Sequence, residues 1–105
     1  MKSIQNLQLP NSKEPFQEWI KKLDTQHRAS IRVFIDRVAN GGGRKNIKAL
    51  GDGVFEIKID RGPGFRVYFG EIGNEIILLL VGGDKSTQRR DITTAKEYWR
   101  NYVSK

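Results

Sequence analysis

The sequence has no cysteine and a single histidine, His27. Disulfides, thiolate zinc sites and histidine-rich metal clusters are therefore excluded. Long apolar runs are also missing, because the longest, Ile76 to Val81, is far shorter than the roughly 20 residues that cross a membrane. The amino terminus, MKSIQNLQLPNSKEPF, lacks the apolar stretch of a signal peptide. We expect a soluble, cytoplasmic protein that uses no metal or other cofactor.

Acidic residues are in the minority, with 12 of them against 19 lysines and arginines, which gives a formal net charge of +7. This excess favours a polyanionic partner, either nucleic acid or an acidic protein, although a merely soluble basic surface would explain the charge as well. The chain has 105 residues, of which 37% are hydrophobic and 30% charged, so it is globular and long enough for one modest core. We expect a single domain over residues 1–105.

Apolar residues recur with helical spacing in three segments, near residues 15–23, 25–40 and 91–102. Pro15 suits a first helical turn, and Thr25 and Asp91 can cap the other two helices. Glycines 41–43 end the second helix, so the first two helices should form an antiparallel hairpin. The apolar stripes are Phe16, Trp19, Ile20 and Leu23; Ile31, Phe34, Ile35 and Val38; and Ile92, Ala95, Trp99 and Tyr102.

Strands are predicted between these helices. Residues 54–60 and 65–69 alternate apolar and polar side chains, and a first strand is predicted within residues 2–9. Residues 76–81 are apolar throughout, as expected of a central strand covered on both faces. Glycine-rich turns separate the last three strands. The predicted order is β-α-α-β-β-β-α, an α+β fold whose antiparallel sheet packs on a helical hairpin, with a C-terminal helix.

The alternating strands also predict a polar surface. If their apolar residues face the helices, then Glu56, Lys58, Arg66 and Tyr68 share the opposite face. Cations from two further segments would approach the same surface. The basic residues could neutralise phosphates, and the ring of Tyr68 could stack on an unpaired base. An ordinary solvated strand face is the alternative for any one of these residues. The RNA-binding candidates from the further segments are Arg44, Lys45, Lys48, Gln88, Arg89 and Arg90.

A family signature lies in the stretches GDGVFEIKIDRGPGFRVYFG, IILLLVGGDKSTQRRDI and AKEYW. From about Phe16 to Tyr102 the chain resembles the addiction-module killer proteins of the RelE/ParE toxin superfamily, which are related to HigB-type toxins. The resemblance implies a RelE-like fold and metal-independent, ribosome-dependent cleavage of messenger RNA that inhibits translation. It also implies a helix-turn-helix antitoxin as partner, and contact with operator DNA through the antitoxin complex.

The implied reaction is attack of a ribose 2′-hydroxyl on the adjacent phosphate, which needs a base, cations facing the phosphorane and an acid for the leaving oxygen. By resemblance, Arg66 matches a phosphate-facing arginine, and Lys58 matches a lysine that acts as base or electrostatic clamp. Lys85 stands where RelE has a second catalytic arginine, and Glu56 stands where RelE has a lysine, so Glu56 could be a general base. Tyr68 could be the acid, stack on a base, or only pack.

Two other functions stay open. A ParE-like inhibitor of DNA gyrase would share this fold, so architecture does not separate it from a nuclease. An inactive member that only binds its antitoxin and operator DNA would also fit, since Lys85 and Glu56 both depart from the RelE pattern. His27, Trp19 and Trp99 are expected to have structural roles.

Overall fold

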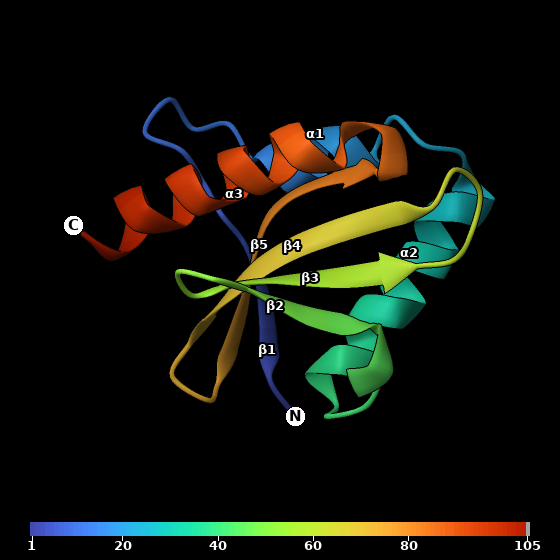
Figure 1. The fold of residues 1–105 in the computed structure, drawn as a ribbon, viewed down its shortest axis with the longest axis horizontal. Coiled ribbons are helices and arrows are strands. Elements are labelled where there is room, and N and C mark those ends of the chain that lie inside the picture. Colours follow the sequence, from blue (N-terminus) through green and yellow to red (C-terminus); the bar gives the residue numbers. More distant parts are fainter. Residues whose placement is uncertain (105) are drawn as a thin grey trace.

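One strand, two helices, four strands and a final helix follow one another in a computed structural model that describes residues 1–104 (Figure 1). The elements are β1 (Ser3–Asn6), α1 (Pro15–Ile20), α2 (Thr25–Ala39), the 3-10 turn η1 (Arg44–Asn46), β2 (Ile47–Gly51), β3 (Val54–Ile59), β4 (Phe65–Ile72), β5 (Ile76–Asp84), the 3-10 turn η2 (Lys85–Thr87) and α3 (Gln88–Val103).

The predicted α+β fold is confirmed, with two differences in the sheet. The strand order is β1-β5-β4-β3-β2, and β1 pairs parallel to β5, whereas the other pairs are antiparallel. The sheet is therefore mixed, because the chain crosses one face through the helices before β5 returns beside β1. The edge strand β2 was not predicted; it pairs with β3 and carries an irregularity between Ala49 and Gly51.

The helices cover both faces of the sheet. On one face, Phe16 of α1 and Ile31 and Ile35 of α2 pack against Val67 and other apolar residues of the strands. The opposite face packs against α3, chiefly through Ala95. Figure 1 shows the strands lying between α2 and α3. No helix within residues 1–104 is long and apolar enough to cross a membrane.

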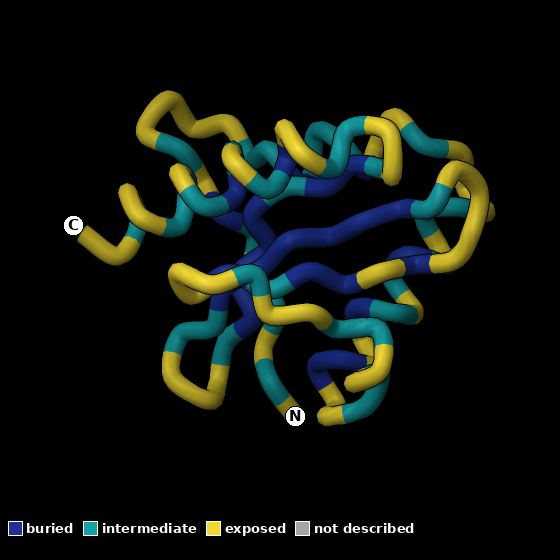
Figure 2. The backbone as a smooth tube through the Cα atoms, in the orientation of Figure 1, coloured by how far each residue is buried: buried dark blue, intermediate teal, exposed yellow. Residues whose placement is uncertain are grey.

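The central position predicted for the apolar run of residues 76–81 is confirmed. Ile77 and Leu79 of β5 belong to the core beneath α1 and α2, and Leu78 and Leu80 belong to the core beneath α3. The buried stretches of β4 and β5 run through the middle of the molecule in Figure 2. A strand in this position needs apolar residues on both faces, which explains why it does not alternate.

Two helix starts differ from the prediction. Asp24, not Thr25, caps α2, since its Oδ1 accepts a hydrogen bond of 2.8 Å from the backbone N–H of His27. Asp91 does not cap the last helix, because α3 begins at Gln88 as a continuation of η2. Asp91 is instead 4% exposed within the first turn.

Candidate active site

The polar face of β3 and β4 lies beneath α3 and is not the solvated surface that alternation predicted. Glu56 is 3% exposed, Arg66 is 6% exposed and Tyr68 is fully buried, whereas Lys58 is exposed. The first turn of α3 reaches this face directly, because Gln88 Nε2 donates a hydrogen bond of 2.9 Å to Glu56 Oε2. Burial by α3 therefore corrects the expected exposure of Glu56, Arg66 and Tyr68.

Three cations from separate segments meet at one end of this face. Lys58 and Arg66 are direct partners in the β3–β4 ladder, so their side chains share one face of the sheet. Lys85 of η2 lies close to Arg66, because both residues are near Gly64. A Cβ built on Gly64 would lie 3.3 Å from Arg66 Nη1 and 3.5 Å from the Cβ of Lys85. Lys58 and Lys85 are exposed, whereas Arg66 is buried. We call Lys58, Arg66 and Lys85 the cation cluster.

The guanidinium of Arg66 is held by the backbone and forms no direct ion pair with an acid among residues 1–104. Its Nη1 donates to the carbonyl oxygens of Gly64, at 2.9 Å, and Phe65, at 3.1 Å. Its Nε is buried without a hydrogen-bond partner, and no carboxylate among residues 1–104 forms an ion pair with it. Two buried acids, Glu56 and Asp91, lie nearby, since their charges and that of Arg66 all act on the phenol of Tyr68. Because neither acid is in direct contact with the guanidinium, a phosphate could still pair with it through charged hydrogen bonds.

Tyr68 faces Glu56 across the β3–β4 ladder. Burial, and then the charge of Glu56, raise the pKa of Tyr68 above its usual value. The phenol therefore stays protonated near neutral pH and releases its proton poorly, which argues against a role as general acid. Because the ring is fully buried, it cannot stack on a base in this structure. Tyr68 packs in the core beneath α3, and its buried hydroxyl has no hydrogen-bond partner among residues 1–104.

Asp91 is a buried acid that sequence reasoning treated only as a helix cap. Its Oδ2 accepts a hydrogen bond of 2.5 Å from Thr87 Oγ1, and its Oδ1 lies 3.5 Å from Arg90 Nε. A Cβ on Gly83, which is the ladder partner of Arg66, would overlap Asp91 Oδ2. The glycine before Asp84 in the GGDK motif was the available signal, because glycine in a buried strand often marks a close approach by another group.

The other RNA-binding candidates divide between two sides of the sheet. Lys48 is exposed and pairs with Glu56 in the β2–β3 ladder, which places it on the face of the cation cluster. Arg89 and Arg90 are exposed in the first turn of α3, while Lys45 is exposed in η1.

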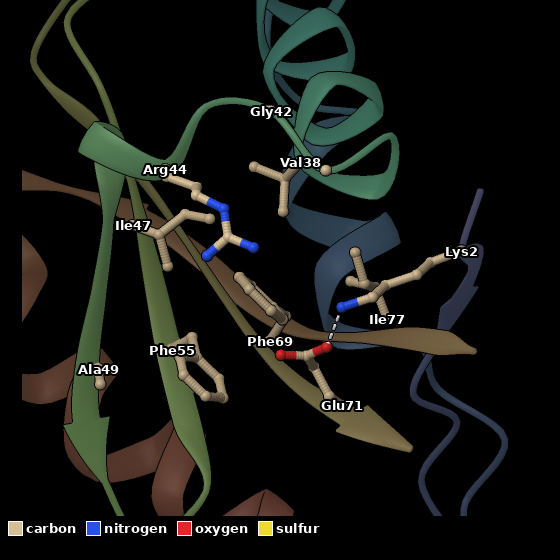
Figure 3. A pocket seen from close by; sticks show the side chains of 11 residues that line it. Lys2, Val38, Gly42, Arg44, Ile47, Ala49, Phe55, Phe69, Glu71 and Ile77 are labelled. Carbon is tan, nitrogen blue, oxygen red and sulfur yellow. Dashed lines mark hydrogen bonds and ion pairs between the residues drawn. The ribbon is translucent and has the colours of Figure 1, made fainter. Parts of the chain in front are cut away.

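Arg44 lies on the opposite side from the cation cluster. It lines a pocket with Val38 of α2 and Phe69 of β4, and both of these belong to the core beneath α1 and α2 (Figure 3). The expectation that Arg44 joins one shared basic surface is therefore wrong. The reason is local. Arg44 is the first residue of η1, which leads directly into β2, and its side chain lies on the same face as that of Ile47.

Asp84 fixes the turn that carries Lys85. Its Oδ1 accepts hydrogen bonds from the N–H of Ser86, at 2.8 Å, and from Ser86 Oγ, at 2.6 Å, while its own N–H donates to Thr87 Oγ1 at 3.1 Å. The hydrogen bond from the Ser86 side chain is the main cause that lowers the pKa of Asp84. The ionised carboxylate is therefore favoured by the fold.

Asp84→Ala is expected to lower the free energy of unfolding by about 1 kcal/mol at pH 7, since it removes a capping acceptor. Because the pKa of Asp84 is lower in the folded state, its contribution is present above the unfolded-state pKa of about 3.9 and is lost as the pH falls through the folded pKa. Urea denaturation of both proteins at pH 7 and at about pH 3 measures this. A difference that persists unchanged at the lower pH would contradict the role of the ionised carboxylate.

Comparison with known proteins finds one family model and one similar protein. The family model described as "Phage derived protein Gp49-like (DUF891)" matches residues 18–100, a segment that contains the cation cluster. An uncharacterized protein of Haemophilus influenzae (strain Rd) is 43% identical over 82 residues, which cover 77% of this chain and 82% of that protein.

Proposed function

The chain belongs to the Gp49-like family of phage-derived proteins, which is associated with RelE-like toxins, and we propose that it is the toxin of a toxin–antitoxin pair that cleaves messenger RNA on the ribosome. The cation cluster is the observation that supports this proposal. It combines a guanidinium that forms no direct ion pair with two exposed lysines, which suits a phosphodiester whose charge increases during the reaction.

The proposed reaction is an internal transfer of the phosphate. The ribose 2′-oxygen forms a bond to phosphorus while the bond from phosphorus to the 5′-oxygen breaks, leaving a 2′,3′-cyclic phosphate and a 5′-hydroxyl. Arg66 stabilises the phosphorane and Lys58 holds the phosphate from the adjacent strand. The ammonium of Lys85 donates a proton to the departing 5′-oxygen, and the carboxylate of Glu56 accepts the proton of the 2′-hydroxyl.

Partners follow from the same proposal. The toxin would act in the cytoplasm, where it meets ribosomes and their messenger RNA, and a helix-turn-helix antitoxin would silence it. The complex with the antitoxin would bind operator DNA. Lys48, Arg89 and Arg90 are exposed cations that could extend the contact with RNA phosphates on either side of the cation cluster.

One observation favours a second candidate, an inactive member that binds only its antitoxin and operator DNA. Glu56 and Arg66 are almost completely buried, and Gln88 is hydrogen-bonded to Glu56 at the edge of the cluster. The phosphate of an RNA could fully contact the guanidinium of Arg66 only if the first turn of α3 moved away from the sheet.

Expression of the protein alone in a bacterium tests the proposal. We expect growth arrest, with cuts inside codons of translated transcripts in primer extension and without cuts when translation is blocked. Harmless overproduction would favour the inactive member. DNA damage without RNA cuts would indicate inhibition of gyrase.

A further inference from the structure

The face opposite the cation cluster contains a cavity of about 310 Å³ that lies beside the last residues of α2 (Figure 3). Its floor is formed by Phe55 and Phe69, whose rings stack with centroids 5.4 Å apart and an angle of 20° between their planes. The aliphatic side chains of Val38, Ile47 and Ile77 form its walls. Helix α2 ends at Ala39, so it does not cover this part of the sheet.

The cavity carries one cation that the protein leaves unpaired. Figure 3 shows the guanidinium of Arg44 pointing into the cavity above the aromatic floor. Among residues 1–104, Arg44 forms no ion pair and its side chain makes no hydrogen bond. The other cation, Lys2, is paired with Glu71 at the edge of the cavity. The cavity therefore combines apolar surface with a net positive charge.

We propose that this cavity binds an acidic segment of a partner protein through one bulky apolar side chain and a neighbouring carboxylate. The apolar side chain would lie on Phe55 and Phe69, and the carboxylate would pair with Arg44, which can accept it in a bidentate arrangement. The net charge of +7 would attract an acidic segment.

The size of the cavity favours a side chain over a free small molecule. Its volume of about 310 Å³ lies at the lower end of the range of about 300–1,000 Å³ that is usual for small-molecule sites. An aromatic side chain fills such a space and is further held by the chain on either side of it. Aromatic side chains are also the groups that most often anchor protein interfaces.

The proposed partner would leave the cation cluster open. The cavity belongs to the face beneath α1 and α2, while Arg66 lies beneath α3 on the other face. The inference therefore does not depend on the proposed nuclease activity, and a chain without activity could still bind a partner here.

Amide chemical-shift mapping on the ¹⁵N-labelled full chain tests the inference, with the acetylated peptide Glu-Glu-Phe-Glu-Glu as the probe. We expect shifts centred on Ala49, Phe55 and Phe69. Arg44→Gln is expected to weaken binding about tenfold, which is the usual effect of losing a charged hydrogen bond. Lys45→Gln removes the same charge from an exposed neighbour outside the cavity, so it is the matched control and should change the affinity by less than about twofold.

A second variant tests the apolar part of the proposal. Ala49 is exposed and lines the cavity, so Ala49→Phe should fill the mouth of the cavity and abolish binding while the protein stays folded. A peptide with glycine in place of phenylalanine should produce no shifts in the cavity.

Four results would overturn the proposal. Equal losses in Arg44→Gln and Lys45→Gln would indicate diffuse charge attraction, and shifts centred on Lys58 and Lys85 would place the peptide on the other face. Shifts that grow with protein concentration alone would indicate a second copy of the chain. Equally tight binding of free 3-phenylpropionate would indicate a small-molecule site. None of these measurements involves RNA cleavage, so failure here is distinct from failure of the proposed function.

Discussion

Arg66→Ala is expected to lower the rate of ribosome-dependent RNA cleavage by about 100- to 1,000-fold and to abolish growth arrest, because removing one pre-positioned donor to a developing oxyanion typically has this effect. The carbonyl oxygens of Gly64 and Phe65 fix the guanidinium before RNA binds. No carboxylate among the described residues forms a direct ion pair with it. Quantitative primer extension on one induced transcript, with matched amounts of protein, measures the loss.

Two controls separate chemistry from folding. Arg66→Ala also removes two hydrogen bonds to the backbone and leaves space in a buried region, so thermal unfolding must show that the variant is folded at the assay temperature. Arg37→Ala removes an exposed arginine whose guanidinium lies 5.2 Å from the Phe34 ring on α2, and it should remain fully toxic. A folded Arg66→Ala protein that still arrests growth would contradict the proposed role of Arg66.

The sequence predicts those helices and strands in which apolar residues recur at the regular spacing of the element, because this spacing shows which side chains are buried. The stripes of α2 and α3 have the 3.6-residue period of helices, and each stripe packs on the sheet as predicted. Strand β2 has no such pattern, because Lys48 and Ala49 at its centre are both exposed and it pairs on one side only. An edge strand buries too little apolar surface to show a clear alternation.

The site could be predicted only in part for a related reason. Alternation correctly placed Lys58 and Arg66 on one face, since side-chain direction follows directly from the pleat of a strand. It does not say which element covers that face. The apolar stripe of α3 requires a covering partner, and α1 and α2 already occupy the other side of the sheet. That inference would have predicted the burial of Glu56 and Tyr68 beneath α3.

Two consecutive glycines of β5, Gly82 and Gly83, allow helices on both faces of the sheet to approach the backbone of this strand. Gly82 lies beneath the ring of Trp19 from α1, while Gly83 lies beneath Asp91 from α3. A Cβ at either position would overlap the group above it. The two residues therefore let elements on opposite faces contact the backbone of the strand, and the second of them keeps α3 close to the candidate active site.

Gly82→Ala is expected to lower the free energy of unfolding by about 1–3 kcal/mol, the usual cost of forcing extra volume into a well-packed region. The added methyl group would overlap the six-membered ring of Trp19, at its Cε3 and Cζ3 atoms. Trp19 cannot move away freely, because its ring also contacts Phe16, with centroids 5.7 Å apart, and Phe65, with centroids 6.0 Å apart. Urea denaturation measures the change.

A double-mutant cycle shows whether Trp19 causes this loss. In the Trp19→Leu protein the rigid ring is gone, so adding Gly82→Ala should cost much less than in the original chain, with a coupling of more than about 0.5 kcal/mol. Gly70→Ala provides a parallel case, since its Cβ would overlap the ring of Trp99 on the other face, and its cost should not depend on Trp19. If the costs of Trp19→Leu and Gly82→Ala simply add, the glycine is required for some other reason than contact with the ring, because direct steric conflict between two groups must vanish when one is removed.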